Sequence, residues 1–163
     1  LCLIYHKLYA VPVKIVRPFN VYGPGMRVDD YRVIPRFLTS ALKRSALPVH
    51  AGGNRTRTFC YITDAITAFF KVLLSKKSGE AYNIGNDQPE VNMMDLARMI
   101  TELFPKKVDI KSVNYPDTYP QGDPRRRCPD LTKIRQSLGY SPKVDLKLGL
   151  SRTLKWYKSY MSK

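Results

Sequence analysis

Short segments rich in β-branched residues alternate along this chain with segments whose apolar residues recur at helical spacing. Strands are predicted at residues 11–16, 47–50, 56–62, 81–84 and 108–113. Helices are predicted at residues 1–9, 33–42, 63–74, 92–103, 131–138 and 146–160. This alternation is typical of an α/β layer structure. Because the chain has no internal repeat and no convincing linker, residues 1–163 are expected to form a single unit.

Some of these elements carry more detailed expectations. The strand at 11–16 is expected to be buried. Asn92 and Asp95 have the spacing of a helix N-cap and its third residue. Gly139 is expected to end the helix at 131–138. The helix at 63–74 is expected to bury its large apolar side chains, Ile66, Phe69, Phe70, Leu73 and Leu74.

The charge of the chain indicates an anionic partner or an acidic neighbour. The 28 Lys and Arg residues against 13 Asp and Glu give a formal net charge of +15. Such a surplus suits nucleic acid, anionic lipid or a phosphorylated small molecule. It is equally compatible with an acidic stretch of a longer protein that balances it. The chain starts without methionine and inside a helical pattern, so we expect it to be a piece of such a longer protein.

The cysteine and histidine content argues against several classes of site. Cys2, Cys60 and Cys128 are far apart and form no C-x-x-C pair, which disfavours a disulfide framework or a zinc site. With only His6 and His50 available, no metal centre is expected. No apolar run is long enough to span a bilayer, so no membrane insertion is expected. A reducing, cytoplasmic location is predicted.

Arginines on predicted loops are the strongest candidates for ligand binding. The chain has no G-x-G-x-x-G fingerprint, no G-x-S-x-G elbow and no P-loop. Arg57 instead follows a glycine turn, Arg32 starts a predicted helix, and the run at 125–127 lies in a long polar loop predicted at 114–129. A guanidinium matches phosphate oxygens two at a time. Three such groups from separate loops suit a diphosphate. Solvated surface charge explains the same composition, so composition alone does not separate the two interpretations.

Four ordered motifs resemble one known family. Residues 17–24 read RPFNVYGP, and residues 48–52 (PVHAG) are followed by TRTFCYITD at 56–64. Residues 82–85 read YNIG, and residues 123–130 read DPRRRCPD. In this order they resemble the extended short-chain dehydrogenase/reductases that act on nucleotide sugars, NAD-dependent epimerases and dehydratases. The last motif, together with Arg32 and Val33, most resembles the UDP-glucuronate decarboxylase branch.

The resemblance implies a fold class and a division of labour. The chain is expected to be the C-terminal, substrate-binding half of such an enzyme, with the N-terminal Rossmann portion missing. Residues 1–163 would then hold the last part of the Rossmann-type sheet and a nucleotide-sugar-binding subdomain. In the family a Tyr-x-x-x-Lys pair oxidises the sugar at C4 with NAD. No lysine follows Tyr5 or Tyr9 at that spacing, so no catalytic residue is expected in this chain. NAD is expected for the intact parent, but negligible NAD binding and no turnover for this chain alone.

The resemblance also implies binding roles for individual residues. Asn20 matches a phosphate-binding asparagine, and Pro18 matches the position whose backbone faces the nicotinamide amide. Pro48 and His50 match the strand whose backbone reads the edge of uracil or thymine, although His50 replaces the usual tyrosine or phenylalanine. The arginines that match those around the diphosphate and nucleoside are Arg32, Arg57 and Arg127.

One departure from the family pattern and two residues outside the expected binding set limit this assignment. Gly25 stands where the decarboxylases usually have arginine, so the branch, and with it the reaction, stays open between epimerisation, dehydration and decarboxylation. Asn83 is expected to cap a strand end rather than bind a ligand. Arg55 is expected on the opposite side of its strand from Arg57, away from the diphosphate.

The expected ligand is a UDP- or dTDP-sugar, and the expected assembly is a homodimer. The alternative from a different class is a stand-alone basic module that binds nucleic acid. Such a module should show a basic stripe interleaved with exposed aromatic residues. Many tyrosines here, such as Tyr22, Tyr61 and Tyr82, are instead accounted for by the family motifs. We therefore expect no nucleic-acid partner.

Overall fold

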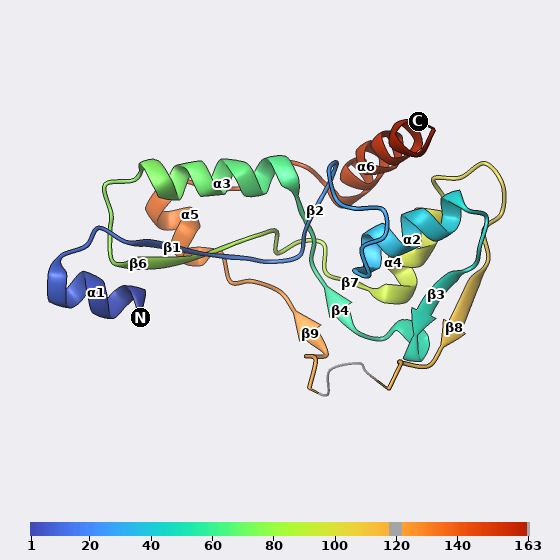
Figure 1. Ribbon diagram of the computed structural model, residues 1–163, viewed down its shortest axis with the longest axis horizontal. Coiled ribbons are helices and arrows are strands. Elements are labelled where there is room, and N and C mark those ends of the chain that lie inside the picture. The colour runs from blue at the N-terminus through green and yellow to red at the C-terminus, as the bar shows by residue number, and fades with distance from the viewer. Residues whose placement is uncertain (118–121, 163) are drawn as a thin grey trace.

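The structure is a computed structural model that describes residues 1–117 and 122–162. Residues 118–121 of the predicted loop at 114–129 thus lie outside the described residues. Figure 1 shows an elongated α/β arrangement, with α1, α3, α5, β1 and β6 at one end and α2, α4, β3 and β8 at the other. The helices are α1 (Cys2–Tyr9), α2 (Val33–Leu42), α3 (Ile62–Leu74), α4 (Met93–Thr101), α5 (Thr132–Leu138) and α6 (Leu146–Met161), with a 3-10 turn at Ala51–Gly53.

The described strands are short and pair mostly in parallel. Three parallel pairs form, and β4 is central in a three-stranded group, antiparallel to β7 and parallel to β9. The pairs are β1 (Lys14–Pro18) with β6 (Glu80–Ile84), β2 (Val21–Tyr22) with β5 (Cys60–Tyr61), and β3 (Leu47–His50) with β8 (Ile110–Val113). The three-stranded group consists of β7 (Val91–Asn92), β4 (Thr56–Arg57) and β9 (Arg126–Arg127). The α/β character predicted from the alternation is confirmed.

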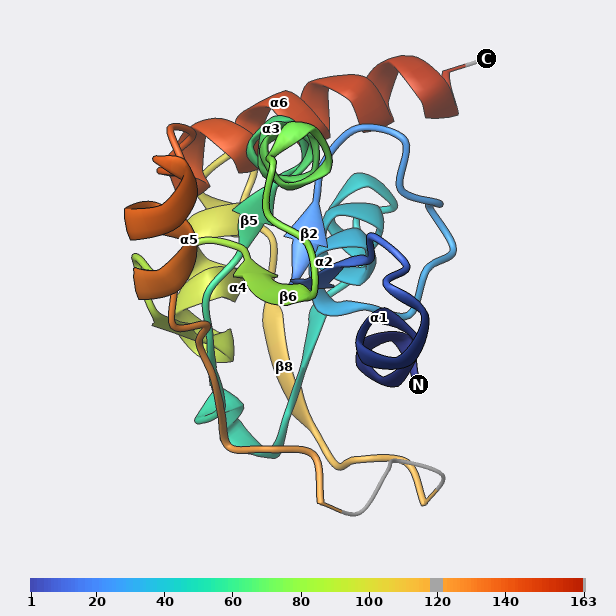
Figure 2. The same cartoon turned by 90° about the vertical axis from the view of Figure 1, so that its left-hand side faces the viewer.

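One end of the molecule is built on the β1–β6 pair. Figure 2 shows α3 end-on above β6, with α5 on one side and α1 on the other. A small core joins α3, β6 and α5, and it contains Ala68, Val72, Tyr82, Ile84, Leu131, Ile134 and Tyr140. Gly139 ends α5 in the left-handed conformation with φ 58°, as predicted.

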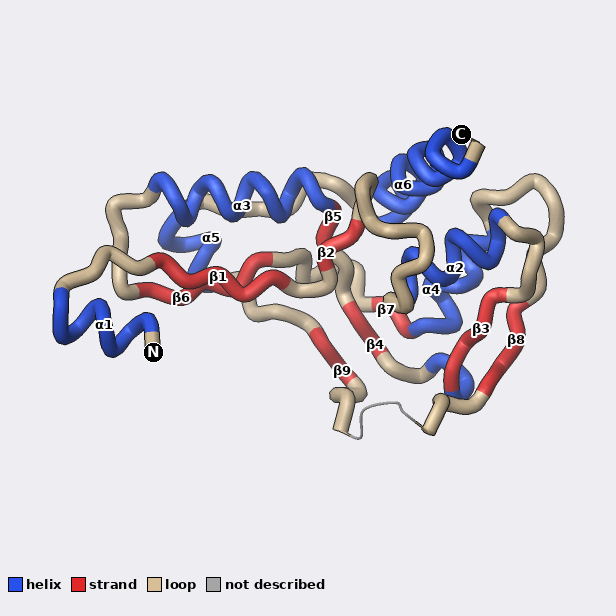
Figure 3. The backbone as a smooth tube through the Cα atoms, viewed as in Figure 1, coloured by secondary structure: helices blue, strands red, loops and turns tan. Residues whose placement is uncertain are grey.

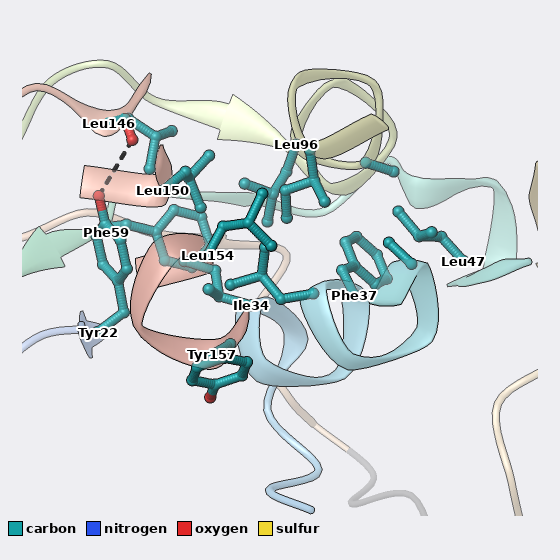
Figure 4. Packing of buried hydrophobic residues seen from close by; sticks show 14 of the residues in the cluster. Tyr22, Ile34, Phe37, Leu47, Phe59, Leu96, Leu146, Leu150, Leu154 and Tyr157 are labelled. Carbon is teal, nitrogen blue, oxygen red and sulfur yellow. Dashed lines mark hydrogen bonds between the residues drawn. The ribbon is translucent and has the colours of Figure 1, made fainter. Parts of the chain in front are cut away.

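A larger core lies where α2, α4 and α6 meet, as Figure 4 shows. Phe37 of α2 and Leu96 of α4 are almost completely buried, and Leu150 comes from α6. The hydroxyl of Tyr22 donates to the carbonyl of Leu146 at 3.2 Å, which fastens the start of α6 to β2. Burial raises the pKa of the Tyr22 hydroxyl well above its usual value, so this group stays a neutral donor.

Three expectations about the elements are wrong. The strand predicted at 11–16 begins at Lys14 and is only partly buried. The single strand predicted at 56–62 is two short strands, β4 and β5, interrupted at Thr58 and Phe59. The large apolar side chains of α3 are exposed, and its buried residues are Asp64, Ala65, Ala68 and Val72. The small side chains let α3 pack closely on the β1–β6 pair, so the bulky ones face outward.

Among the described residues, no helix is long and apolar enough to cross a membrane.

Candidate functional site

The β4–β9 pair brings two of the predicted arginines together from distant parts of the chain. Arg57 and Arg127 are partners in the parallel register of these strands. The amide of Thr56 donates to the carbonyl of Arg125 at 2.9 Å, and the amide of Thr58 donates to that of Arg127 at 3.3 Å. Figure 3 shows β9 lying along β4, although the two strands are far apart in sequence. Neighbouring register positions place their side chains on the same side of a sheet.

A carboxylate occupies the point on which these arginines converge. The Nη2 atom of Arg57 donates to Oδ2 of Asp123 at 2.8 Å, and Nη2 of Arg127 donates to Oδ1 at 3.1 Å. Arg55 also donates to the carboxylate of Asp123, and to its backbone carbonyl at 2.9 Å. We call Arg55, Arg57, Arg127 and Asp123 the arginine cluster. Its three guanidinium groups and one carboxylate leave a net charge of +2.

The placement of Arg55 differs from the expectation. It does not lie away from Arg57 but binds the same carboxylate. The reason is that β4 begins at Thr56, so Arg55 precedes the strand and strand alternation does not set the direction of its side chain.

Asn20 is joined to the arginine cluster through the backbone of Thr58. Its Nδ2 donates to the carbonyl of Thr58 at 2.8 Å, while the amide of Thr58 bonds to Arg127. Asn20 has a φ of 43°, a left-handed conformation that asparagine tolerates better than most residues. It follows β1, whose last residue is Pro18. The predicted phosphate-binding asparagine and two of the predicted arginines are thus neighbours.

His50 is connected to the arginine cluster through Tyr115. The His50 and Tyr115 rings stack at 5.0 Å and 13°, and the Arg55 guanidinium lies 4.8 Å from the Tyr115 ring centre. Nη1 of Arg36 donates to Nε2 of His50 at 3.0 Å. Because arginine only donates, Nε2 is the acceptor, and Nδ1 carries the proton that it gives to the Asn114 carbonyl at 2.9 Å.

The remaining predicted residues lie apart from this arrangement or support it. Pro48 is in β3, paired with Lys111 of β8. Arg32 precedes α2 and forms its ion pair with Asp30 at 2.5 Å, not with Asp123. The hydrogen bonds from Arg32 hold the pKa of Asp30 below its usual value. Asn83 donates to the carbonyl of Asp130 at 3.1 Å, a contact that fits the structural role expected for it.

Three residues of this site were missed in the sequence: Arg55, Tyr115 and Asp123. Asp123 opens the DPRRRCPD motif, which was the one signal available for it. Among the described residues, no group of three or more His, Cys, Asp or Glu side chains is placed to hold a metal ion.

The residues after β1 do not fit the pyrophosphate of NAD. In a dinucleotide site a glycine-rich turn links a strand to a helix, so that backbone amides approach the phosphates. Here β1 runs into Pro18, Phe19 and Asn20, and the 163-residue sequence contains no G-x-G-x-x-G. Nearby, a Cβ added at Gly23 would clash with the side chain of Ile62, so packing requires that glycine.

Comparison with known proteins identifies the family. The model of the NAD dependent epimerase/dehydratase family matches residues 1–85, which contain the predicted RPFNVYGP and TRTFCYITD motifs. The chain belongs to this family. It is 41% identical over 147 residues to UDP-glucuronic acid decarboxylase 5 of Arabidopsis thaliana, an alignment that covers 90% of this chain and 41% of that protein. The predicted likeness to UDP-glucuronate decarboxylases is confirmed.

Two other similar proteins show how far the likeness extends. The UDP-N-acetyl-alpha-D-glucosaminuronate decarboxylase of Bacillus cytotoxicus is 37% identical over 97% of this chain and 50% of its own length. The crystal structure of UDP-glucuronic acid 4-epimerase from Bacillus cereus, in complex with UDP-glucuronic acid and NAD, superposes with a TM-score of 0.87 at 31% identity. That superposition covers 98% of this chain and 49% of the epimerase. The chain thus spans about half, or less, of these relatives.

The family match corrects the predicted fold class. We expected the substrate-binding half alone, with the Rossmann portion missing. Residues 1–85 match the model of the NAD dependent epimerase/dehydratase family, and they include α1, β1, α3 and all of β6. The expectation is wrong, because the first half of this α/β fragment belongs to the family's epimerase domain.

Proposed function

We propose that the arginine cluster binds the diphosphate of a UDP- or dTDP-sugar, as part of an NAD-dependent epimerase, dehydratase or decarboxylase that acts through oxidation at C4. The observation that carries the proposal is the convergence of Arg57 and Arg127 in the β4–β9 register, with Asn20 bonded to the intervening Thr58. Their net positive charge suits a diphosphate, and guanidinium forks match its oxygens. Relatives whose names specify UDP-sugar substrates support the substrate class.

The other predicted residues are assigned to the rest of the substrate and to the nicotinamide. The backbone of β3 at Pro48 and His50 would read the edge of the pyrimidine, and Tyr115 adds an aromatic plane beside His50. Arg32 would contribute from the start of α2 if its bond to Asp30 opened. Pro18 would face the nicotinamide of the intact parent. These roles, and the division of residues 1–163 into a Rossmann-type portion and a nucleotide-sugar-binding portion, stay predictions.

Calorimetric titration of UDP against arginine variants tests the diphosphate site. Charge-assisted hydrogen bonds contribute about 1.5–3 kcal/mol, so Arg57→Ala and Arg127→Ala should each weaken UDP about ten- to a hundredfold. Arg57→Lys should restore only part of the affinity, since it keeps the charge and loses the fork. Arg126→Ala is the matched control, because Arg126 neighbours Arg127 in β9 but pairs with Glu90.

The same titrations distinguish the nucleic-acid alternative. A general polyanion site would lose similar affinity on Arg126→Ala and Arg127→Ala, and DNA would compete with UDP. That pair of results would refute the diphosphate site. Thermal unfolding of each variant checks that Arg57→Ala, at a buried position, remains folded.

We also propose that this chain alone turns over no nucleotide sugar and binds NAD negligibly. The proposal is supported by the absence of G-x-G-x-x-G and of any Tyr-x-x-x-Lys in its 163 residues. Product formed by the purified chain, or micromolar NAD binding by calorimetry, would contradict it. The predicted reducing, cytoplasmic location is supported by the free thiols of Cys2, Cys60 and Cys128.

A further inference from the structure

The guanidinium of Arg57 is bonded to two backbone carbonyls and to the Asp123 carboxylate. Its Nη1 donates to the carbonyl of Thr56 in the same strand at 2.8 Å and to that of Arg125, just before β9, at 3.2 Å. Its Nη2 donates to the Asp123 carboxylate. The Arg57 side chain is only 10% exposed and that of Asp123 is 16% exposed. A phosphate that binds Arg57 and Arg127 through paired oxygens therefore takes the place of this carboxylate.

Asp123 makes the contacts that an oxyanion ligand would make in this cluster. Oδ1 accepts from Arg127, and Oδ2 accepts from Arg57 and Arg55. Carboxylates and phosphates offer the same paired oxygens to a guanidinium fork. We propose that Asp123 is an internal competing ligand of the arginine cluster, which a diphosphate displaces when it binds. This inference rests on the proposed diphosphate site.

An internal competitor of this kind determines which anions the site accepts. When Asp123 is displaced, three guanidinium groups lose the carboxylate that they bind. A diphosphate replaces the single negative charge of that carboxylate with at least two. A free carboxylate such as acetate returns only one, and it competes with a carboxylate that is tethered to the site. The cluster should therefore bind UDP and inorganic pyrophosphate and exclude simple carboxylates.

Asp123→Asn tests the competition directly, by calorimetric titration of UDP and of inorganic pyrophosphate. Apparent affinity falls by the fraction of molecules whose site is open. If Asp123 occupies the cluster about nine-tenths of the time, removing its charge should strengthen both ligands about tenfold. Asp117→Asn is the matched control, because it removes the same charge from an exposed position of the same loop. It should change either affinity less than about twofold.

If Asp123→Asn binds UDP and pyrophosphate no more tightly than the unmodified chain, the inference is overturned. Weaker binding would show that Asp123 instead holds the arginines in position. A second measurement needs no substitution. Saturating UDP should speed amide hydrogen exchange at Gly122 and Asp123 of the unmodified chain, because the carboxylate that anchors them is released. Slower exchange there would also overturn it.

The outcomes separate this inference from the proposed function. If Arg57→Ala weakens UDP but Asp123→Asn does not strengthen it, the diphosphate site stands and the competition is wrong. If neither the unmodified chain nor Asp123→Asn binds UDP, the diphosphate site itself is refuted.

Discussion

At the scale of single residues, Gly149 marks the closest approach of α6 to the strands. A Cβ built there would overlap the Tyr22 hydroxyl and lie 3.0 Å from Cδ2 of Tyr61. Alanine usually stabilises a helix by about 1 kcal/mol over glycine, but overpacking a core costs about 1–3 kcal/mol. Because Tyr22 is buried and bonded to Leu146, it has little room to move. We expect Gly149→Ala to lower the thermal midpoint.

Circular dichroism melts measure this effect. Ser151→Ala, on the exposed side of the same helix, controls for helix propensity and should leave the midpoint unchanged or raise it slightly. A Gly149→Ala protein as stable as the unmodified one would show that the α6 contact is loose.

The arginine cluster shows what residue patterns predict and what they miss. Arg57 and Arg127 were found because family motifs contain them, and their adjacency follows once β4 and β9 pair. Asp123 was missed as a partner because 66 residues separate it from Arg57. The direction of Arg55 was wrong because alternation was applied one residue before the strand begins. Local patterns identify the residues, but the long-range pairing decides what each one touches.

At the scale of elements, the N-cap of α4 was correctly predicted from the sequence. Oδ1 of Asn92 accepts from the Asp95 amide at 2.8 Å, as the spacing predicted. Asn92→Ala should destabilise the protein by about 1 kcal/mol, because a helix-terminal amide loses its acceptor. Asn92→Ser keeps an acceptor and should restore most of that loss. Equal urea midpoints for the two variants would contradict the capping role.

For α3, the sequence predicted the bounds of the helix but not its buried face. Its bounds were predicted to within one residue. The buried face was not, because the prediction followed the bulky side chains, whereas Ala65 and Ala68 make the close contact. Which face of a helix is covered depends on neighbours that its own sequence does not specify.

At the scale of the whole molecule, paired carboxylates set the response to acid. Hydrogen bonds from Arg32 and Arg135 hold the pKa of Asp30 and of Asp87 below the ordinary value, and those from Thr56 and Arg126 do so for Glu90. A lowered folded-state pKa means that the stabilisation is fully present above the ordinary values of 3.8 and 4.5 and is lost as pH falls below them. We expect the urea midpoint to stay level from neutral pH to about 5 and then to drop.

Asp87→Asn provides the comparison for this acid response. The variant should begin less stable at neutral pH and lose less on acidification, since one paired carboxylate is gone. A parallel loss in both proteins would show that the Asp87–Arg135 pair contributes nothing measurable.

Exposed apolar side chains of α1 and α3 lie at one end of the molecule. α1 has no buried residue, and α3 turns its bulky side chains outward. The exposed apolar residues of these helices are Leu3, Ile4, Tyr5, Leu8, Tyr9, Ile66, Phe69, Phe70, Leu73 and Leu74. Exposed apolar surface favours association, whereas a net charge of +15 opposes it. Salt screens the repulsion and leaves the apolar attraction in place.

We therefore expect self-association that strengthens with both protein and salt concentration, measured by light scattering coupled to size exclusion. Leu74→Glu places a charge in the apolar face of α3 and should shift the equilibrium toward monomer. Leu148→Glu adds the same charge at an exposed site on α6, away from α1 and α3, and should have little effect. If net charge alone governed association, the two variants would behave alike. A monomer at high protein and high salt would mean that these apolar faces do not associate, and the predicted homodimer would then have no support from them.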